Sequence, residues 1–143
     1  MKLTKNNLSI ACVVLSFLGF LDATYLTILH YKNAFPPCTI SGCERVLTSE
    51  YSIILGIPLS LFGSLFYLII IGLSLATVLH KRKIFAHGLF ISACTGLFVS
   101  AVLFFIQMFA IKSFCQYCLL SEAFSIGIFV SCSLLYSRFL RVR

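Results

Sequence analysis

Residues 84–111 read IFAHGLFISACTGLFVSAVLFFIQMFAI, and none of these 28 residues is Asp, Glu, Lys or Arg. A helix needs about 20 predominantly apolar residues to cross the roughly 30 Å hydrocarbon core of a bilayer. The stretch is long enough to cross with some tilt. Because a backbone in lipid has to satisfy its own hydrogen bonds, such a stretch forms a helix. The sequence therefore predicts a transmembrane helix over residues 84–111.

Three more apolar runs of this kind are Leu8–Leu29, Ile53–Leu79 and Phe114–Tyr136. Of the 143 residues, 60% are hydrophobic and 10% are charged, against about 25% charged in an ordinary soluble domain. The mean hydropathy is +1.06. These values exclude a soluble globular enzyme, a disordered chain and a coiled coil. We expect an all-α integral membrane four-helix bundle, with residues 1–143 as one membrane domain and an uncleaved first span.

The basic residues predict the orientation of this bundle, and the net charge of +7 indicates membrane topology rather than nucleic-acid binding. Eight of the eleven basic residues flank the spans on one side: Lys2, Lys5, Lys81, Arg82, Lys83, Arg138, Arg141 and Arg143. Loops rich in Lys and Arg stay in the cytoplasm. We predict cytoplasmic N and C termini, with a long outer loop at about residues 31–52.

Four of the seven cysteines fall at the outer end of the predicted bundle. Cys38 and Cys43 lie in the long loop, which we expect to be mobile, and Cys115 and Cys118 form a Cys-x-x-Cys motif where the fourth span begins. The outer side of a cell membrane is the oxidising side. Each pair can close a disulfide there, and the two pairs can exchange through a mixed disulfide. We predict these four cysteines as the catalytic residues.

The Cys-x-x-Cys motif has a physical reason to be reactive. Ser113 and Gln116 have the spacing of a capping box, which predicts a helix start with Cys115 in its first turn. The positive end of a helix dipole lowers the pKa of a thiol and favours the nucleophilic thiolate. Cys118 is expected one turn deeper, at the lipid boundary, where a membrane-soluble electron acceptor can reach it.

Other interpretations of the cysteines stay open at this point. The two pairs could be structural disulfides, or the four thiols could bind zinc as a Cys₄ site. An oxidising face disfavours zinc, and we predict no metal site. Cys12, Cys94 and Cys132 fall within the spans, and we interpret them as small apolar fillers.

The pattern resembles the vitamin K epoxide reductase family in its short bacterial form. The similarity extends over nearly the whole four-span region. Its specific part is the order of the cysteines, a wide loop pair before a Cys-x-x-Cys at the membrane edge. Further matching stretches are Asp22–Thr27 with His30 and Tyr31, and Gly56–Gly63 (GIPLSLFG), which opens the second span.

The resemblance implies a role for each matching residue. Cys38 would exchange with a partner protein, Cys43 would carry electrons to Cys115, and Cys118 would face a quinone and reduce it. Ser49 stands where the family carries a Ser or Thr beside the quinone site. The implied cofactor is a membrane quinone, ubiquinone or menaquinone. Many bacterial relatives carry a fused thioredoxin-like domain, which we do not find up to Arg143, so the implied partner is a separate periplasmic, DsbA-like thioredoxin-fold protein.

Two acidic residues fall within the predicted spans, Asp22 and Glu122. An ionisable group inside a membrane is costly and marks a functional site by default. Glu122 follows Cys118 by one helical turn on the same face and could relay protons as a quinone is reduced. Vertebrate relatives carry a tyrosine at that position. With Ser49, these two acids are our predicted quinone-binding residues.

The leading hypothesis is a quinone-linked thiol oxidoreductase, multi-pass in the inner (cytoplasmic) membrane. It would reoxidise a periplasmic thioredoxin-fold protein that forms disulfides, and it would pass the electrons through two cysteine pairs to a quinone. One alternative is a DsbB-type quinone reductase, but there the Cys-x-x-Cys precedes the wider pair. Another is a small non-enzymatic membrane transporter with structural disulfides, which would need polar residues along a midplane path.

Overall fold

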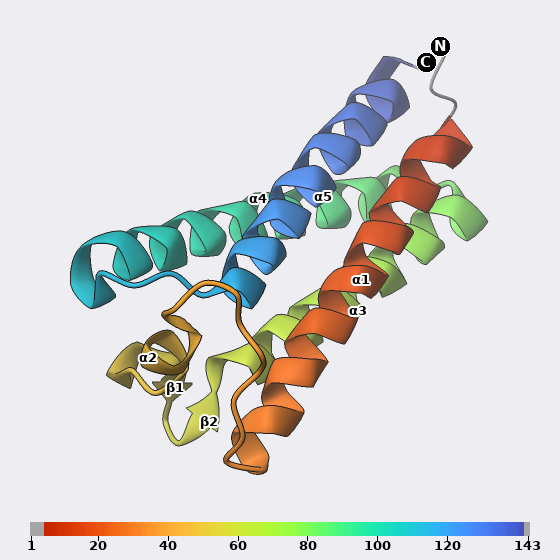
Figure 1. Cartoon of the computed structure of the whole chain (residues 1–143). Coiled ribbons are helices and arrows are strands. Elements are labelled where there is room, and N and C mark those ends of the chain that lie inside the picture. Colours follow the sequence, from red (N-terminus) through yellow and green to blue (C-terminus); the bar gives the residue numbers. More distant parts are fainter. Residues whose placement is uncertain (1–4, 142–143) are drawn as a thin grey trace.

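Four long helices dominate the structure, a computed structural model that describes residues 5–141 (Figure 1). They are α1 (Lys5–Tyr31), α3 (Leu59–His80), α4 (Lys83–Phe105) and α5 (Gln116–Arg141). Each belongs to a segment that is long and apolar enough to cross a membrane. The protein is therefore a multi-pass, all-α four-helix membrane bundle, which confirms the predicted fold class.

The helices pack around a shared apolar centre. Helix α1 packs against α3 and α5, and α4 packs against α5 and α3. The central buried side chains come from all four helices: Leu8, Tyr67, Ile70, Leu89, Ile128 and Leu135. The α1–α3 contact is close at Gly19, where a β-carbon would lie 2.5 Å from the Tyr67 ring. Small residues at such points let helix backbones approach each other in lipid.

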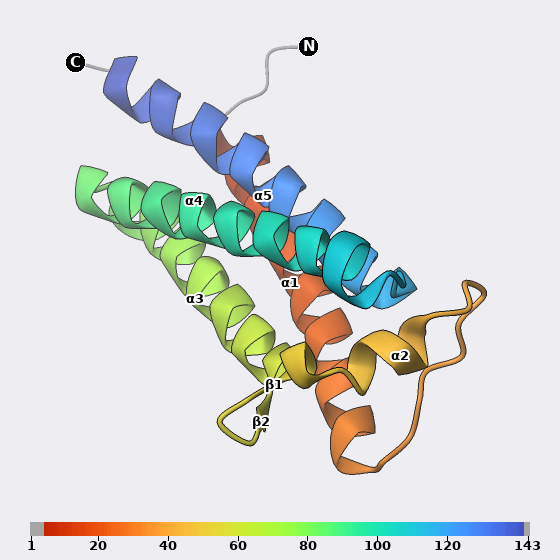
Figure 2. The ribbon, with the colours of Figure 1, turned by 90° about the vertical axis from the view of Figure 1, so that its left-hand side faces the viewer.

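The outer loop has secondary structure of its own, gathered at one end of the bundle (Figure 2). It contains α2 (Cys43–Leu47), a 3₁₀ turn η1 (Glu50–Ser52), and the strands β1 (Ile53–Ile54) and β2 (Ile57–Pro58). The strands pair antiparallel across a turn in which Leu55 and Gly56 have φ values of 52° and 83°. The second span therefore begins at Leu59 rather than at the predicted Ile53, because residues 53–58 form this hairpin.

The third span changes helix type before it ends. After α4 the chain continues as a π-helix, η2 (Ile106–Ile111), and it leaves the helix at Lys112 in the left-handed conformation with φ 53°. The carbonyl of Gln107 accepts the N–H of Lys112, and it accepts the N–H of Ser113 at 3.2 Å. Turns of the π type are rare and occur frequently at functional sites. Here the turn carries the buried side chain of Gln107.

The start of α1, the α3–α4 link and the end of α5 lie at the end opposite the outer loop (Figures 1 and 2). Lys81, Arg82, Lys83, Arg138 and Arg141 belong to these segments. Lys2 and Arg143 lie outside the described residues. The arrangement agrees with basic residues on one side of a membrane, and the cytoplasmic placement of that side stays a prediction.

Candidate functional site

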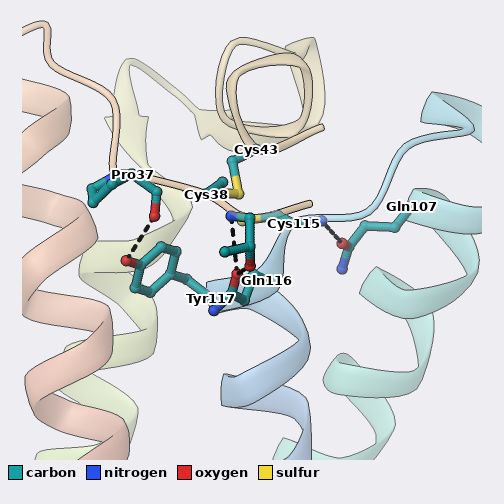
Figure 3. The surroundings of a disulfide bond; sticks show 8 residues. Pro37, Cys38, Cys43, Gln107, Cys115, Gln116 and Tyr117 are labelled. Carbon is teal, nitrogen blue, oxygen red and sulfur yellow. Dashed lines mark hydrogen bonds between the residues drawn. A yellow bond between two sulfur atoms is a disulfide. The ribbon is translucent and has the colours of Figure 1, made fainter. Parts of the chain in front are cut away.

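The loop cysteines form a disulfide, Cys38–Cys43, with a Cα–Cα distance of 6.4 Å. Three hydrogen bonds hold the loop against α5. Thr39 donates to Gln116 Oε1 through Oγ1 at 2.6 Å and through its N–H at 3.4 Å, and Tyr117 Oη donates to the Pro37 carbonyl at 3.2 Å (Figure 3). The loop that we expected to be mobile is therefore docked on the start of α5. Cys38 is half-buried, whereas Cys43 is 3% exposed.

The docked loop brings Cys43 to Cys115. These two side chains share one buried apolar cluster with Val46, and Cys38 and Cys118 pack at the edge of this cluster. Cys115 is 0% exposed, so the docked loop separates it from solvent. Gly42 permits the close approach, because a β-carbon at that position would lie 2.6 Å from the carbonyl oxygen of Phe114. All four predicted catalytic cysteines are thus brought to one place.

Cys115 is the residue that immediately precedes α5, which begins at Gln116. Its carbonyl accepts the first helical hydrogen bond, from the N–H of Leu119 at 2.9 Å, so Cys115 occupies the cap position rather than the predicted first turn. The predicted pairing of Gln116 with Ser113 is also replaced, since the Gln116 side chain accepts hydrogen bonds from Thr39 across the loop. A capping box depends on local sequence, and here a residue distant in sequence takes the Gln116 oxygen.

A hydrogen bond with the Cys118 thiol lowers the pKa of Cys115. The pKa of this thiol falls from 9.0 to about 7. The largest cause is a hydrogen bond with the Cys118 thiol, and the backbone N–H groups of Cys118 and Tyr117 add to it against the opposing effect of burial. Donors that face a sulfur stabilise its thiolate form. Cys115 and Cys118 are both free thiols in the structure, beside the oxidised loop pair.

A cavity of about 430 Å³ lies next to the cysteines, between the helices and under the outer loop. Cys118 lines it, together with all three predicted quinone-binding residues, Asp22, Ser49 and Glu122. Its walls are otherwise mostly apolar, with residues such as Leu26, Leu59, Leu103 and Ile106. Pockets for small organic ligands have this character: about 300–1,000 Å³, apolar walls and a few polar groups.

The three predicted quinone-binding residues in the cavity differ in their hydrogen bonding. Ser49 Oγ donates to the carbonyl of Val46 at 2.7 Å, so its hydroxyl proton is already engaged. Asp22 Oδ2 is buried, and within residues 5–141 it has no hydrogen-bond partner. Glu122 is 9% exposed, and its Oε1 accepts a hydrogen bond from Gln107 Nε2 at 2.8 Å.

Sequence reasoning missed Gln107, which also lines the cavity. Its Oε1 accepts the N–H of Cys115 at 3.1 Å (Figure 3). The residue therefore contacts both the Cys-x-x-Cys segment and the acid of α5. The sequence did contain a signal for Gln107. It is a polar residue near the outer end of an otherwise apolar span, and polar groups within spans mark functional sites. Its partners could not be deduced without the π-helical turn.

The three remaining cysteines lie away from this cavity. Cys12 and Cys132 are buried in the central cluster, where their sulfur atoms are 3.0 Å apart and one thiol hydrogen-bonds to the other. They join α1 to α5 ten residues along each helix from Asp22 and Glu122, about 15 Å at 1.5 Å per residue. Cys94 is half-buried on α4. Across residues 5–141, no three His, Cys, Asp or Glu side chains gather as metal ligands.

The structure is a four-helix membrane bundle. Two adjoining cysteine pairs lie at one end of it, beside a mostly apolar cavity. A model of the vitamin K epoxide reductase family matches residues 10–133, and the chain belongs to this family. The chain is also similar to the thiol-disulfide oxidoreductase LTO1 of Arabidopsis thaliana, with 32% identity over 119 residues. The match covers 76% of this chain and 31% of that relative, so the chain spans less than a third of the relative's length.

Proposed function

We propose that this protein is a thiol oxidoreductase that accepts electrons from a dithiol partner and passes them to a membrane quinone. One observation carries the proposal: the four cysteines form a continuous series from surface to cavity. Cys38 is half-buried at the surface, Cys43 and Cys115 share a buried cluster, and Cys118 lines the cavity. Family membership and the name of the relative LTO1 support a reaction of thiols.

The first exchange takes place at the loop pair. A thiolate of the partner attacks the Cys38 sulfur, and Cys43 leaves as a thiolate. The second thiol of the partner then attacks the partner sulfur of this mixed disulfide and releases Cys38. The partner leaves as a disulfide, and its two electrons remain in the Cys38–Cys43 dithiol. The greater exposure of Cys38 supports its role as the residue that meets the partner.

The second exchange takes place inside the buried cluster. The Cys43 thiolate attacks Cys115 in a Cys115–Cys118 disulfide, and Cys118 leaves as a thiolate toward the cavity. Cys38 then attacks Cys43, which closes the loop disulfide and releases Cys115 as a thiolate. The lowered pKa of Cys115 favours this release, because a thiol of low pKa is a good leaving group. This step ends with the loop pair oxidised and with Cys115 and Cys118 reduced.

The cavity fits a quinone on three counts: its size, its apolar walls, and a buried carboxyl oxygen at Asp22 with no partner in the described residues. A bound quinone, ubiquinone or menaquinone, would supply a two-electron, two-proton acceptor. Asp22 would hold one of its polar oxygens, Ser49 would hold the other once its hydroxyl turns away from the Val46 carbonyl, and Cys118 lies in the wall beside it. Glu122 would hold a proton at its carboxyl group.

We further propose that the protein works in the inner (cytoplasmic) membrane as one membrane domain, with the cysteine end outside. Its partner would be a periplasmic, DsbA-like thioredoxin-fold protein. The uneven distribution of basic residues supports this orientation. The oxidising side of the membrane is also where disulfides persist.

The test uses the purified protein in lipid vesicles with a short-chain ubiquinone and a reduced DsbA-like protein. We expect the quinone absorbance to fall in parallel with disulfide formation in the partner. Cys118→Ser should abolish both, and Cys94→Ser, a cysteine remote from the cavity, should have no effect. Oxidation of the partner that proceeds equally well without Cys118 would disprove the proposal.

A further inference from the structure

Gln107 holds its amide group between two fixed partners. The side chain is 3% exposed, its Oε1 accepts the N–H of Cys115 at 3.1 Å, and its Nε2 donates to Glu122 Oε1 at 2.8 Å. A backbone N–H can only donate, so Cys115 determines which end of the amide is the oxygen. The amide nitrogen must therefore face Glu122, and the amide cannot turn over without breaking both bonds.

The main chain of Gln107 is also held by hydrogen bonds. Its carbonyl accepts the N–H groups of Lys112 and Ser113, which end the π-helix. Gln107, near the end of the third span, thus fixes the position of two groups. These are the backbone N–H of Cys115, just before α5, and the carboxyl group of Glu122 in the second turn of α5.

The Glu122 carboxyl lies among several groups that exchange protons. The titratable neighbours around the cavity and the adjoining turn are Asp22 and His30 on α1, Tyr51 in η1, Tyr67 on α3, and Cys115 and Cys118 at the start of α5. From α4 and its π-helical end, the contact is the neutral amide of Gln107. A donor of fixed direction holds the carboxyl in one place whichever neighbour is charged.

We propose that Gln107 is a positioning residue for quinone reduction and holds the Glu122 carboxyl beside Cys118, where it passes a proton to the acceptor. This inference rests on the proposed function. The Cys115 and Cys118 thiolates released by the exchange take up two protons, and the dithiol then becomes a disulfide as two electrons and two protons pass to the quinone. One proton passes through the Glu122 carboxyl, which is unchanged at the end of the cycle, and the other passes directly from the Cys118 thiol. Gln107 itself neither gains nor loses a proton.

The test measures reduction of a short-chain ubiquinone by the full-length protein, with dithiothreitol as the electron donor so that no partner is needed. Gln107→Glu keeps an oxygen for the Cys115 N–H but replaces the amide donor with a second carboxyl. At the lower of two pH values the two carboxyls can share a proton and restore the hydrogen bond, whereas at a pH high enough to ionise both they repel. We expect kcat close to the wild-type value at the lower pH and about tenfold lower at the higher pH, because a buried hydrogen bond is lost.

Two further variants separate positioning from simple packing. Met108→Leu, a change in the same π-helix at a partly exposed side chain, should leave kcat and its pH profile unchanged. The double variant Gln107→Glu with Glu122→Gln restores the hydrogen bond but moves the carboxyl to the third span. We expect this exchange to recover the thermal stability lost in Gln107→Glu, with kcat still about tenfold low.

The outcomes separate the positioning role of Gln107 from the proposed quinone reduction. A Gln107→Glu variant with the wild-type pH profile, or an exchanged pair with full kcat, would overturn the positioning role while Cys118-dependent quinone reduction stands. Wild-type protein that does not reduce the quinone in a Cys118-dependent manner would overturn the proposed function, and this inference with it.

Discussion

Gly42 lies so close to Phe114 that a β-carbon on residue 42 would be 2.6 Å from the Phe114 carbonyl oxygen. The neighbour is backbone, which cannot turn aside as a flexible side chain can. Any larger residue must therefore push the loop away from the segment that leads into Cys115. Because Cys43 follows Gly42 directly, this contact sets how closely the loop pair approaches Cys115.

We predict that Gly42→Ala slows electron transfer from the loop pair to Cys115 by about tenfold or more, since misplaced reacting groups lose large factors in rate. Reduction of Cys38–Cys43 by a small dithiol should be unaffected. Rapid mixing with dithiothreitol, followed by acid quench and alkylation of each cysteine pair, measures the two steps separately. Gly72→Ala is the control, because nothing lies within 4 Å of a β-carbon there. Equal transfer rates in both variants would contradict the role of the contact.

We predict that Cys43→Ser, mixed with the oxidised thioredoxin-fold partner, accumulates a mixed disulfide through Cys38, because the Cys38 thiolate attacks the disulfide of the partner and displaces one of its two thiols. Cys38 is the more exposed thiol, and without Cys43 the loop cannot reclose its disulfide and release the partner. The adduct is measured as a species of higher mass on non-reducing gels, and mass spectrometry identifies the joined peptide. If Cys38→Ser gives the adduct and Cys43→Ser does not, the two loop roles are exchanged.

The pKa of Cys115, lowered to about 7, predicts a distinctive pH profile of alkylation. In the fully reduced protein, Cys115 reacts with iodoacetamide only when the docked loop opens, because it is 0% exposed. The rate of this reaction should rise through about pH 7 and level off above it, because the thiolate is the reactive form. Cys118→Ala removes the hydrogen bond that contributes most to the lowered pKa, so the midpoint should move to higher pH. Peptide mass spectrometry of the 115–118 segment follows the modification. A midpoint that is the same in both proteins would show that Cys118 does not stabilise the thiolate.

We predict that the triple variant Cys12→Ala, Cys94→Ala and Cys132→Ala keeps the proposed thiol oxidoreductase activity. These thiols lie away from the cavity, although Cys12 and Cys132 contact each other in the core. Loss of that buried contact should lower the free energy of unfolding by roughly 1–2 kcal/mol. Activity is measured with the reduced partner, and stability by thermal denaturation in detergent. An inactive but folded triple variant would mean that the relay includes one of these cysteines.

The sequence predicts the spans well because a long apolar segment in lipid has to satisfy its backbone hydrogen bonds internally and therefore forms a helix. Composition is a weaker guide at the ends of the spans. Ile53 and Ile54 look like part of a span, but the positive φ values at Leu55 and Gly56 turn the chain back into a hairpin. The sequence signal for this turn was Gly56, two residues before Pro58.

The candidate site could be predicted where one residue type carries the chemistry, as with the cysteines and the two acids within spans. The contacts between distant segments could not be predicted. Gln116 bonds to Thr39 across the loop rather than to Ser113, and Gln107 reaches Glu122 only because the third span ends in a π-helix. Such pairings depend on how helices meet, which no local pattern encodes.

The final prediction concerns Asp22, whose buried Oδ2 has no hydrogen-bond partner within the described residues. A protonated carboxyl can donate a hydrogen bond to a quinone oxygen, an asparagine amide can also donate one, and an alanine cannot. If Asp22 acts in binding, Asp22→Asn should keep the KM for a short-chain ubiquinone near the wild-type value, and Asp22→Ala should raise it about tenfold, the effect of one hydrogen bond.

The two variants also report on proton transfer. Asparagine cannot hold and release a proton as a carboxyl does, so a lower kcat in Asp22→Asn with an unchanged KM would assign a second proton path to Asp22. Steady-state kinetics with dithiothreitol as donor measure both constants. Thr24→Val, a change at the other unpartnered buried oxygen on α1, is the control and should alter neither constant. If Asp22→Ala keeps the wild-type KM and kcat, the Asp22 carboxyl plays no part in the quinone site, and Ser49 and Glu122 are left to hold the ring.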